Sequence, residues 1–141
     1  MTSPNLENLA KRGSLKRESP DRREIDTLLK SGKARLRDAR RGELALESRF
    51  DLAYNAAHAI ALAALRSHGY RSEKRYLVFQ CLEDTLGLAP ALWRVLALCH
   101  ERRNVAEYEG HLEVDEQLML DLLRVTDAML EETAARIAAT R

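Results

Sequence analysis

The stretch from Leu52 to Leu65 constrains this chain most, because nearly every position in it is small or apolar. Alanine and leucine are strong helix formers, and no window of the chain alternates polar and apolar residues over the length of a strand. A helix that is apolar on all sides belongs at the centre of a domain, and its alanines allow neighbouring helices to approach closely. We therefore expect a central helix over about residues 44–68.

Glycines, prolines and capping residues predict where the other helices begin and end. Ser19 and Pro20 favour the start of a helix, with Ser19 as its N-cap and Pro20 as its first helical residue. Helices are expected over residues 19–41, 72–86, 90–108 and 115–139. The short connections favour antiparallel neighbours. The predicted fold is all-α: an antiparallel up-and-down bundle of four to five helices over residues 19–141, preceded by a short N-terminal helix or arm at residues 1–18.

Composition supports a single helical domain that needs no metal. The 141 residues are 45% hydrophobic but only 5% aromatic, and 6 glycines and 3 prolines are too few for a turn-rich β-fold. Cys81 and Cys99 fall within helical apolar patterns and lack the spacing of a zinc site. The longest uninterrupted apolar run, Ala59 to Leu65, is far shorter than a membrane span, and the N-terminus resembles no signal peptide. We expect a cytoplasmic protein with no membrane segment and no cofactor.

Charge is distributed unevenly along the chain. Residues 1–41 carry 12 Lys/Arg against 6 Asp/Glu, whereas residues 42–141 carry 11 against 16. A basic N-terminal part on an acidic body favours contact with its own body, a second copy or an acidic partner. The alternative is an ordinary solvated surface of mixed charge.

Arg103 is the most informative candidate site residue. It follows Cys99 by four positions and Leu96 by seven, so it falls on the same helical face as these apolar residues. An arginine beside the core needs a carboxylate, a carbonyl, a phosphate or water. Two interpretations remain: a structural ion pair, for example with Glu107 one turn later, or a cleft that binds an anionic ligand together with Arg102.

The segment around Arg103 resembles the motif of the HEPN superfamily, a group of nucleotide- and RNA-associated helical domains. Arg103-Asn104 followed by Tyr108 is similar to the family's arginine, polar residue and later histidine. The run from Ser48 to His58 and the Tyr70-Arg71 pair also resemble small bacterial HEPN proteins, and the likeness extends over nearly all of residues 6–132.

The resemblance implies a dimeric helical bundle that is related in fold to HEPN toxins of toxin–antitoxin pairs. In nuclease members of the family, the arginine stabilises transition-state charge and the histidine acts in acid–base catalysis. Here Tyr108 occupies the histidine position, and tyrosine is a poor base at neutral pH. The resemblance therefore implies an anion-binding half of the motif without its usual proton shuttle.

His58 is the other candidate, because it follows Tyr54 by one turn on the apolar helix. It is either a core histidine or a member of one polar pocket with Tyr54 and Arg103. His100 is expected at a helix end or in a loop, and the sequence assigns it no role.

Three functions are compatible with these features. The first is a HEPN-like module that forms a homodimer and binds a nucleotide, RNA or a protein such as a nucleotidyltransferase-type partner, in a toxin–antitoxin or stress-response pair. Its ligand-binding residues would be Arg102, Arg103, Asn104, Tyr108, Tyr54 and His58. The second is a metal-independent RNase toxin that uses Arg103 with a nearby histidine, His58 or His111. The third is a helical interaction protein without an anion site.

Overall fold

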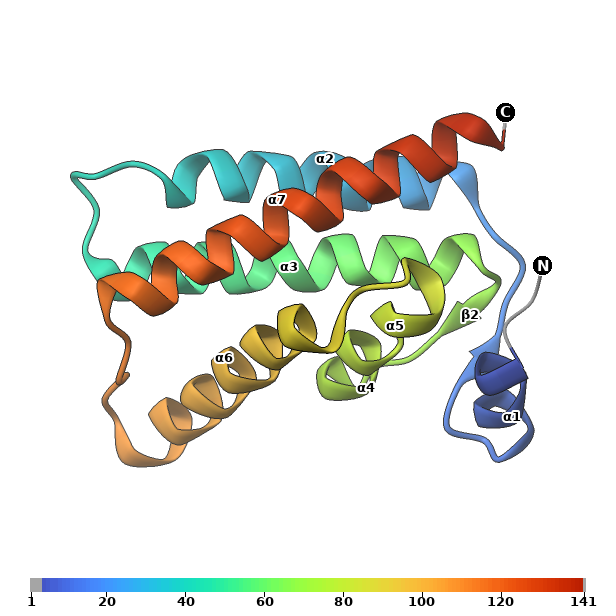
Figure 1. The fold of residues 1–141 in the computed structure, drawn as a ribbon, viewed down its shortest axis with the longest axis horizontal. Coiled ribbons are helices and arrows are strands. Elements are labelled where there is room, and N and C mark those ends of the chain that lie inside the picture. Colours follow the sequence, from blue (N-terminus) through green and yellow to red (C-terminus); the bar gives the residue numbers. More distant parts are fainter. Residues whose placement is uncertain (1–3, 141) are drawn as a thin grey trace.

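The computed structural model describes residues 4–140, and over this range the chain is an all-α bundle, as predicted (Figure 1). The long helices α2, α3, α6 and α7 run alternately in opposite directions. Short elements complete the fold. In chain order the helices and strands are α1 (Pro4–Lys11), β1 (Lys16–Arg17), α2 (Arg22–Ala39), α3 (Leu46–Ser67), β2 (Tyr70–Arg71), α4 (Arg75–Gln80), α5 (Leu82–Thr85), α6 (Pro90–Glu109) and α7 (Glu116–Ala139).

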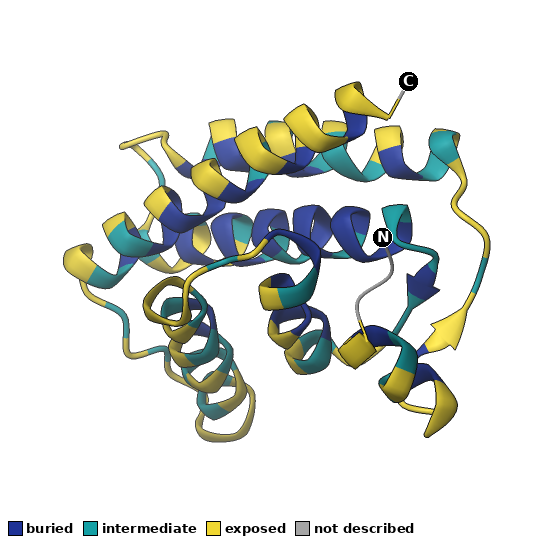
Figure 2. Cartoon of the chain, turned by 45° about the vertical axis from the view of Figure 1, so that its right-hand side comes forward, coloured by how far each residue is buried: buried dark blue, intermediate teal, exposed yellow. Residues whose placement is uncertain are grey.

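The alanine-rich helix α3 is the central element, which confirms the prediction from its sequence. Twelve of its 22 residues are buried, and Figure 2 shows most of it in the buried colour. It contacts α2 and α7 along its length and α4 and α5 on another side. Ala56, Ala57 and Ala61 are fully buried, so small side chains on several faces let the neighbouring helices pack closely.

Gly32 shows how closely α2 approaches α3. A Cβ atom built on Gly32 would lie 2.7 Å from Ile60 Cγ1 and 3.3 Å from the Ala56 carbonyl oxygen. The first distance is shorter than side-chain contacts normally allow, and the second involves backbone. The helix pair therefore depends on the absence of a side chain at this position.

The N-terminal arm packs onto the bundle. Leu6 and Leu15 are buried in the main core, and β1 pairs with β2 in an antiparallel ladder that the sequence did not predict. A two-residue strand is too short to show a period-two pattern, which explains the omission. Residues 1–3, at the start of the predicted arm, lie outside the described residues.

Two local predictions were wrong. The N-cap of α2 is Asp21 rather than Ser19: its carboxylate accepts hydrogen bonds from the Arg23 and Glu24 amides at 3.0 and 3.4 Å. The helix expected over residues 72–86 is interrupted at Cys81, whose ψ of −12° departs from the α-helical value and divides it into α4 and α5. In the described part of the chain, no helix has the length and apolar character needed to cross a membrane.

Candidate functional site

Tyr54 of α3 lies at the centre of the candidate site. Its side chain is buried, and its ring meets Phe79 of α4 edge-on with centroids 5.7 Å apart. Its hydroxyl group lies 2.8 Å from Nδ1 of His100 on α6. This hydrogen bond connects two helices whose paired residues are far apart in sequence.

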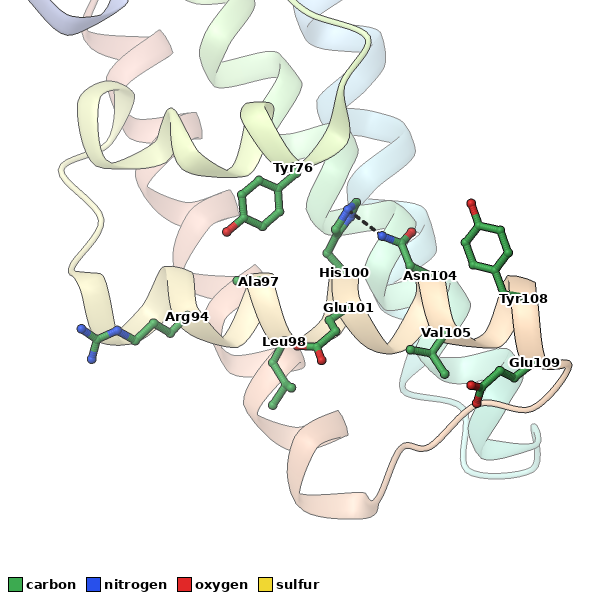
Figure 3. Close-up of a pocket in the computed structure, with 10 residues that line it drawn as sticks. All are labelled: Tyr76, Arg94, Ala97, Leu98, His100, Glu101, Asn104, Val105, Tyr108 and Glu109. Carbon is green, nitrogen blue, oxygen red and sulfur yellow. Dashed lines mark hydrogen bonds between the residues drawn. The ribbon is translucent and has the colours of Figure 1, made fainter.

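His100 forms the second half of this pair and was missed by sequence reasoning. It lies well inside α6 rather than at a helix end, and Nε2 lies 3.2 Å from the Asn104 amide nitrogen, one turn along the helix (Figure 3). A hydrogen bond donated by this amide to Nε2 leaves the imidazole proton on Nδ1, which then donates to the Tyr54 oxygen. The sequence feature that could have revealed this pair is the four-residue spacing of His100 and Asn104, which places them one turn apart on a helix.

Burial affects the titration of both groups. Desolvation lowers the pKa of His100, and the nearby Arg75 cation lowers it further, while Glu107 acts in the opposite direction. Desolvation also raises the pKa of the Tyr54 hydroxyl, although Arg75 and Arg103 partly oppose this. At neutral pH the pair therefore consists of a neutral imidazole and a neutral phenol.

Two arginines from different helices flank the Tyr54 ring. The guanidinium carbon of Arg103 lies 5.1 Å from the ring centroid, and that of Arg75 lies 5.5 Å from it. Both distances are within the range of cation–π contacts. Arg103 pairs with Asp51 of α3, and Arg75 Nη1 donates to Asn55 Oδ1 at 2.9 Å. The structural partner of Arg103 is thus Asp51 and not Glu107.

His58 lies near this cluster without joining its hydrogen bonds. Its ring meets Phe79 edge-on, with centroids 6.2 Å apart, and Nε2 is buried without a hydrogen-bond partner among the described residues. Desolvation, with a smaller effect of Arg75, lowers the pKa of His58 to about 4. No hydrogen bond in the described part of the chain connects His58 to Tyr54 or Arg103, so His100 occupies the place that the sequence hypothesis gave to His58.

The remaining predicted ligand-binding residues, Arg102, Asn104 and Tyr108, lie at different places on the surface of α6. Arg102 lies away from Tyr54 and its Nη1 atom donates to Glu113 Oε2 at 2.9 Å. Tyr108 is 89% exposed. Asn104 and Tyr108 instead border a shallow hollow of about 650 Å³ beside Tyr76 and His100 (Figure 3). Arg103 and Asp51 border a separate hollow of about 630 Å³.

The cluster contains cations, neutral hydrogen-bonding groups and aromatic rings. Among the described residues, no group of three or more histidine, cysteine or acidic side chains is placed to hold a metal ion. Such a cluster is suited to an anionic ligand that has a planar or apolar part. No protein-family model matches the chain, and the comparison with curated proteins finds no match.

Proposed function

We propose that this chain is a HEPN-like helical module that binds a phosphate-bearing ligand, a nucleotide or RNA, at the cluster of Arg75, Tyr54 and Arg103. The convergence of two guanidinium groups on one buried tyrosine is the observation that carries the proposal. A guanidinium group has five N–H donors. In the described structure, Arg75 and Arg103 each use few of these N–H donors in hydrogen bonds to other side chains, which leaves donors for phosphate oxygens.

The Asp51 carboxylate, which would compete with a phosphate for Arg103, is partly solvated. The Asp51 side chain is 52% exposed, so a phosphate that replaces it at Arg103 leaves a carboxylate that water can solvate. Tyr108 is 89% exposed, and its ring is available to stack on a base, whereas the Tyr76 ring already packs against Trp93 and His100. These features favour a nucleotide or single-stranded RNA over inorganic phosphate.

The binding experiment compares arginines inside and outside the cluster. Fluorescence anisotropy with a labelled single-stranded RNA, and separately with a fluorescent ATP analogue, should show that Arg75→Ala and Arg103→Ala each weaken binding by about tenfold, equivalent to about 1.4 kcal/mol. Arg124→Ala is the matched control, because this arginine of α7 is 75% exposed and pairs with Asp121 outside the cluster. Binding should also weaken as salt increases. Absence of binding, or equal losses in the control, would favour a helical interaction protein without an anion site.

A second candidate function is favoured by the position of His100. The His100 imidazole and the Arg103 guanidinium both pack against the Tyr54 ring, and together they supply the two groups that metal-independent RNA cleavage needs. Once Asn104 releases Nε2, the imidazole can take the proton of the ribose 2′-hydroxyl, while the guanidinium stabilises the phosphate that this oxygen attacks as the 5′-oxygen leaves. In this hypothesis His100, not His58 or His111, is the nearby histidine. Cleavage of labelled RNA in the presence of EDTA should then be abolished by His100→Gln while RNA binding remains. Binding without cleavage by the unmodified protein would exclude this candidate.

The partner in a toxin–antitoxin or stress-response pair is part of the same proposal. A nucleotidyltransferase-type protein fits a module with an exposed tyrosine and phosphate-binding arginines, because such an enzyme transfers a nucleoside monophosphate from ATP to a hydroxyl oxygen, with loss of the hydroxyl proton and release of pyrophosphate. Tyr108 offers that hydroxyl at the surface. Mass spectrometry of the purified chain before and after incubation with such an enzyme and ATP would show whether Tyr108 gains a nucleotide, with Tyr108→Phe as control.

A further inference from the structure

A third hollow, of about 640 Å³, lies at the end of the bundle where α3, α5 and α7 finish. Figure 1 shows the C-terminal ends of α3 and α7 near the start of α2 at this end of the bundle. Ser67, on the border of the hollow, lies roughly 20 Å along α3 from Tyr54 at 1.5 Å per residue. The volume is in the range of small-molecule sites. This hollow is therefore a candidate site that is separate from the phosphate-binding cluster.

The charges on the border of this hollow are already balanced. Arg136 is the one ionised side chain among the described residues that border it, and its Nε atom donates to Glu132 Oε1 at 2.7 Å. Its Nη1 and Nη2 atoms donate to the Thr85 and Leu86 carbonyl oxygens at 3.1 and 3.2 Å. Desolvation lowers the pKa of His68, against an opposing effect of its hydrogen bond to Thr85, so the imidazole is neutral at neutral pH. A charged ligand would find no free counter-charge here.

Several groups on the border can accept hydrogen bonds. The hydroxyl groups of Ser67, Thr133 and Thr140 each donate their proton to a carbonyl group three or four residues earlier in the chain, at 2.6 to 2.8 Å. Each oxygen then keeps a lone pair but has no proton to offer. His68 adds another acceptor: Nε2 lies 3.2 Å from the Thr85 carbonyl oxygen and holds the proton, which leaves the lone pair on Nδ1.

Two groups on the border can donate. Thr85 is 1% exposed, and its Oγ1 atom has no hydrogen-bond partner in the part of the chain that the structure describes, although buried polar groups are nearly always paired. Arg136 uses three of its five N–H groups in the bonds above, so two are left. Leu86 and Ile137 add aliphatic surface beside these groups. The border thus combines acceptors, donors and apolar surface without a free charge.

We propose that this hollow binds a neutral polyhydroxylated molecule of the size of a monosaccharide or cyclic polyol. Each hydroxyl group of such a ligand both donates and accepts, which matches a border that offers both kinds of partner. Its C–H groups would pack on the aliphatic side chains of Leu86 and Ile137. The site is independent of the proposed phosphate-binding function, because Arg75, Tyr54 and Arg103 do not border this hollow.

The first test compares neutral and charged probes of similar size by NMR titration of the backbone amide signals. D-Glucose or myo-inositol should shift the signals of residues 67–69, 85–87 and 133–140 in a saturable way and leave those of residues 100–108 unchanged. Protonated glucosamine and glucose 6-phosphate should bind at the same signals about tenfold more weakly, because each brings an unpaired charge. Absence of a saturable shift with both neutral probes, or tighter binding of either charged probe at these signals, would overturn the proposal.

The second test uses Thr85→Val, which keeps the shape of the side chain and removes its hydroxyl group. The free protein should melt at the same or a higher temperature, because an unpaired buried hydroxyl group is lost, while affinity for the neutral probe should fall about tenfold. Thr126→Val is the matched control: this buried threonine of α7 donates to the Leu122 carbonyl at 2.7 Å and does not border the hollow, so affinity should stay unchanged.

A third variant tests the acceptor on the imidazole. His68→Phe keeps a ring but removes Nδ1, and it should also weaken binding of the neutral probe, while Arg136 still donates to the Thr85 carbonyl group. Unchanged affinity in both Thr85→Val and His68→Phe, or an equal loss in Thr126→Val, would contradict the assignment. None of these results depends on nucleotide or RNA binding, which the Arg75 and Arg103 variants measure.

Discussion

Arg66 and Glu24 form an ion pair in which the arginine side chain is 1% exposed and Nε lies 2.6 Å from Oε1. The same guanidinium donates to the Glu18 and Ser19 carbonyl oxygens at 2.8 and 2.7 Å. One buried cation on α3 therefore holds the start of α2 and the segment before it. The pair connects the N-terminal arm to the central helix.

Replacing Arg66 should destabilise the bundle strongly. Arg66→Met retains much of the volume but removes one of the two arginines that contact Glu24 and leaves the Glu18 and Ser19 carbonyl groups without their donor, at a cost of about 1–3 kcal/mol for each buried group left unsatisfied. Arg71→Met is the matched control: Arg71 contacts the carboxylates of Glu18 and Glu24, which both also form ion pairs with Arg66, but Arg71 is 29% exposed, so its loss should have a smaller effect. Chemical denaturation followed by circular dichroism gives both values. Equal losses of unfolding free energy in the two variants would show that Arg66 has no special structural role.

Arg103→Ala should leave the stability of the free protein nearly unchanged. Its partner Asp51 is about half exposed, and an ion pair of this kind contributes about 1 kcal/mol or less. The contact with the Tyr54 ring adds a similar small amount. A thermal melt with and without nucleotide or RNA should therefore show a normal melting temperature but a reduced shift on ligand addition. A large loss of stability without ligand would assign the residue a structural role.

His58 should make the protein less stable in mild acid. Its pKa is lowered to about 4 in the folded state, below the ordinary histidine value, so the unfolded chain takes up a proton at a higher pH than the folded chain does. Stability is therefore complete above about pH 6.5 and is lost as the pH falls toward 4, by at most about 3 kcal/mol.

The measurement for His58 is a comparison of unfolding free energies at several pH values. Carboxylates with lowered pKa values, including Glu7 and Glu24, also lose stabilising charge in acid, so the unmodified protein alone is not sufficient. His58→Gln removes only the contribution of His58 and leaves those of His68 and His100, whose pKa values are also lowered, so the stability of the variant should vary less between pH 6.5 and 4. Identical pH profiles would contradict the assignment.

Gly32→Ala should destabilise the contact between α2 and α3. The added methyl group would lie 2.7 Å from Ile60 Cγ1, and overpacking of this kind costs about 1–3 kcal/mol, more than the helix propensity that alanine adds. In the Ile60→Ala background the same substitution should cost less, because the colliding side chain is gone. If the losses of unfolding free energy caused by Gly32→Ala and Ile60→Ala simply add, α2 and α3 can move apart to accommodate the methyl group.

The sequence by itself determined the helices and which of them is central. The apolar residues of α3 occur on every side, so any fold that buries them must surround that helix, and the glycines and Pro90 that punctuate the chain predicted most ends. It also selected Arg103, Asn104 and Tyr54 as members of one region. Local periodicity contains this information because it depends only on neighbours within one helix.

Only the tertiary structure decided which of these side chains meet. The hydrogen bond between Tyr54 and His100 joins residues 46 positions apart, and the choice of His100 over His58 depends on how α6 and α4 are placed around α3. The burial of Arg66 depends in the same way on carboxyl and carbonyl groups supplied by the arm and α2. Helical periodicity gives the face on which a residue lies but not the partner across it, because partners are set by the packing angles and offsets between helices.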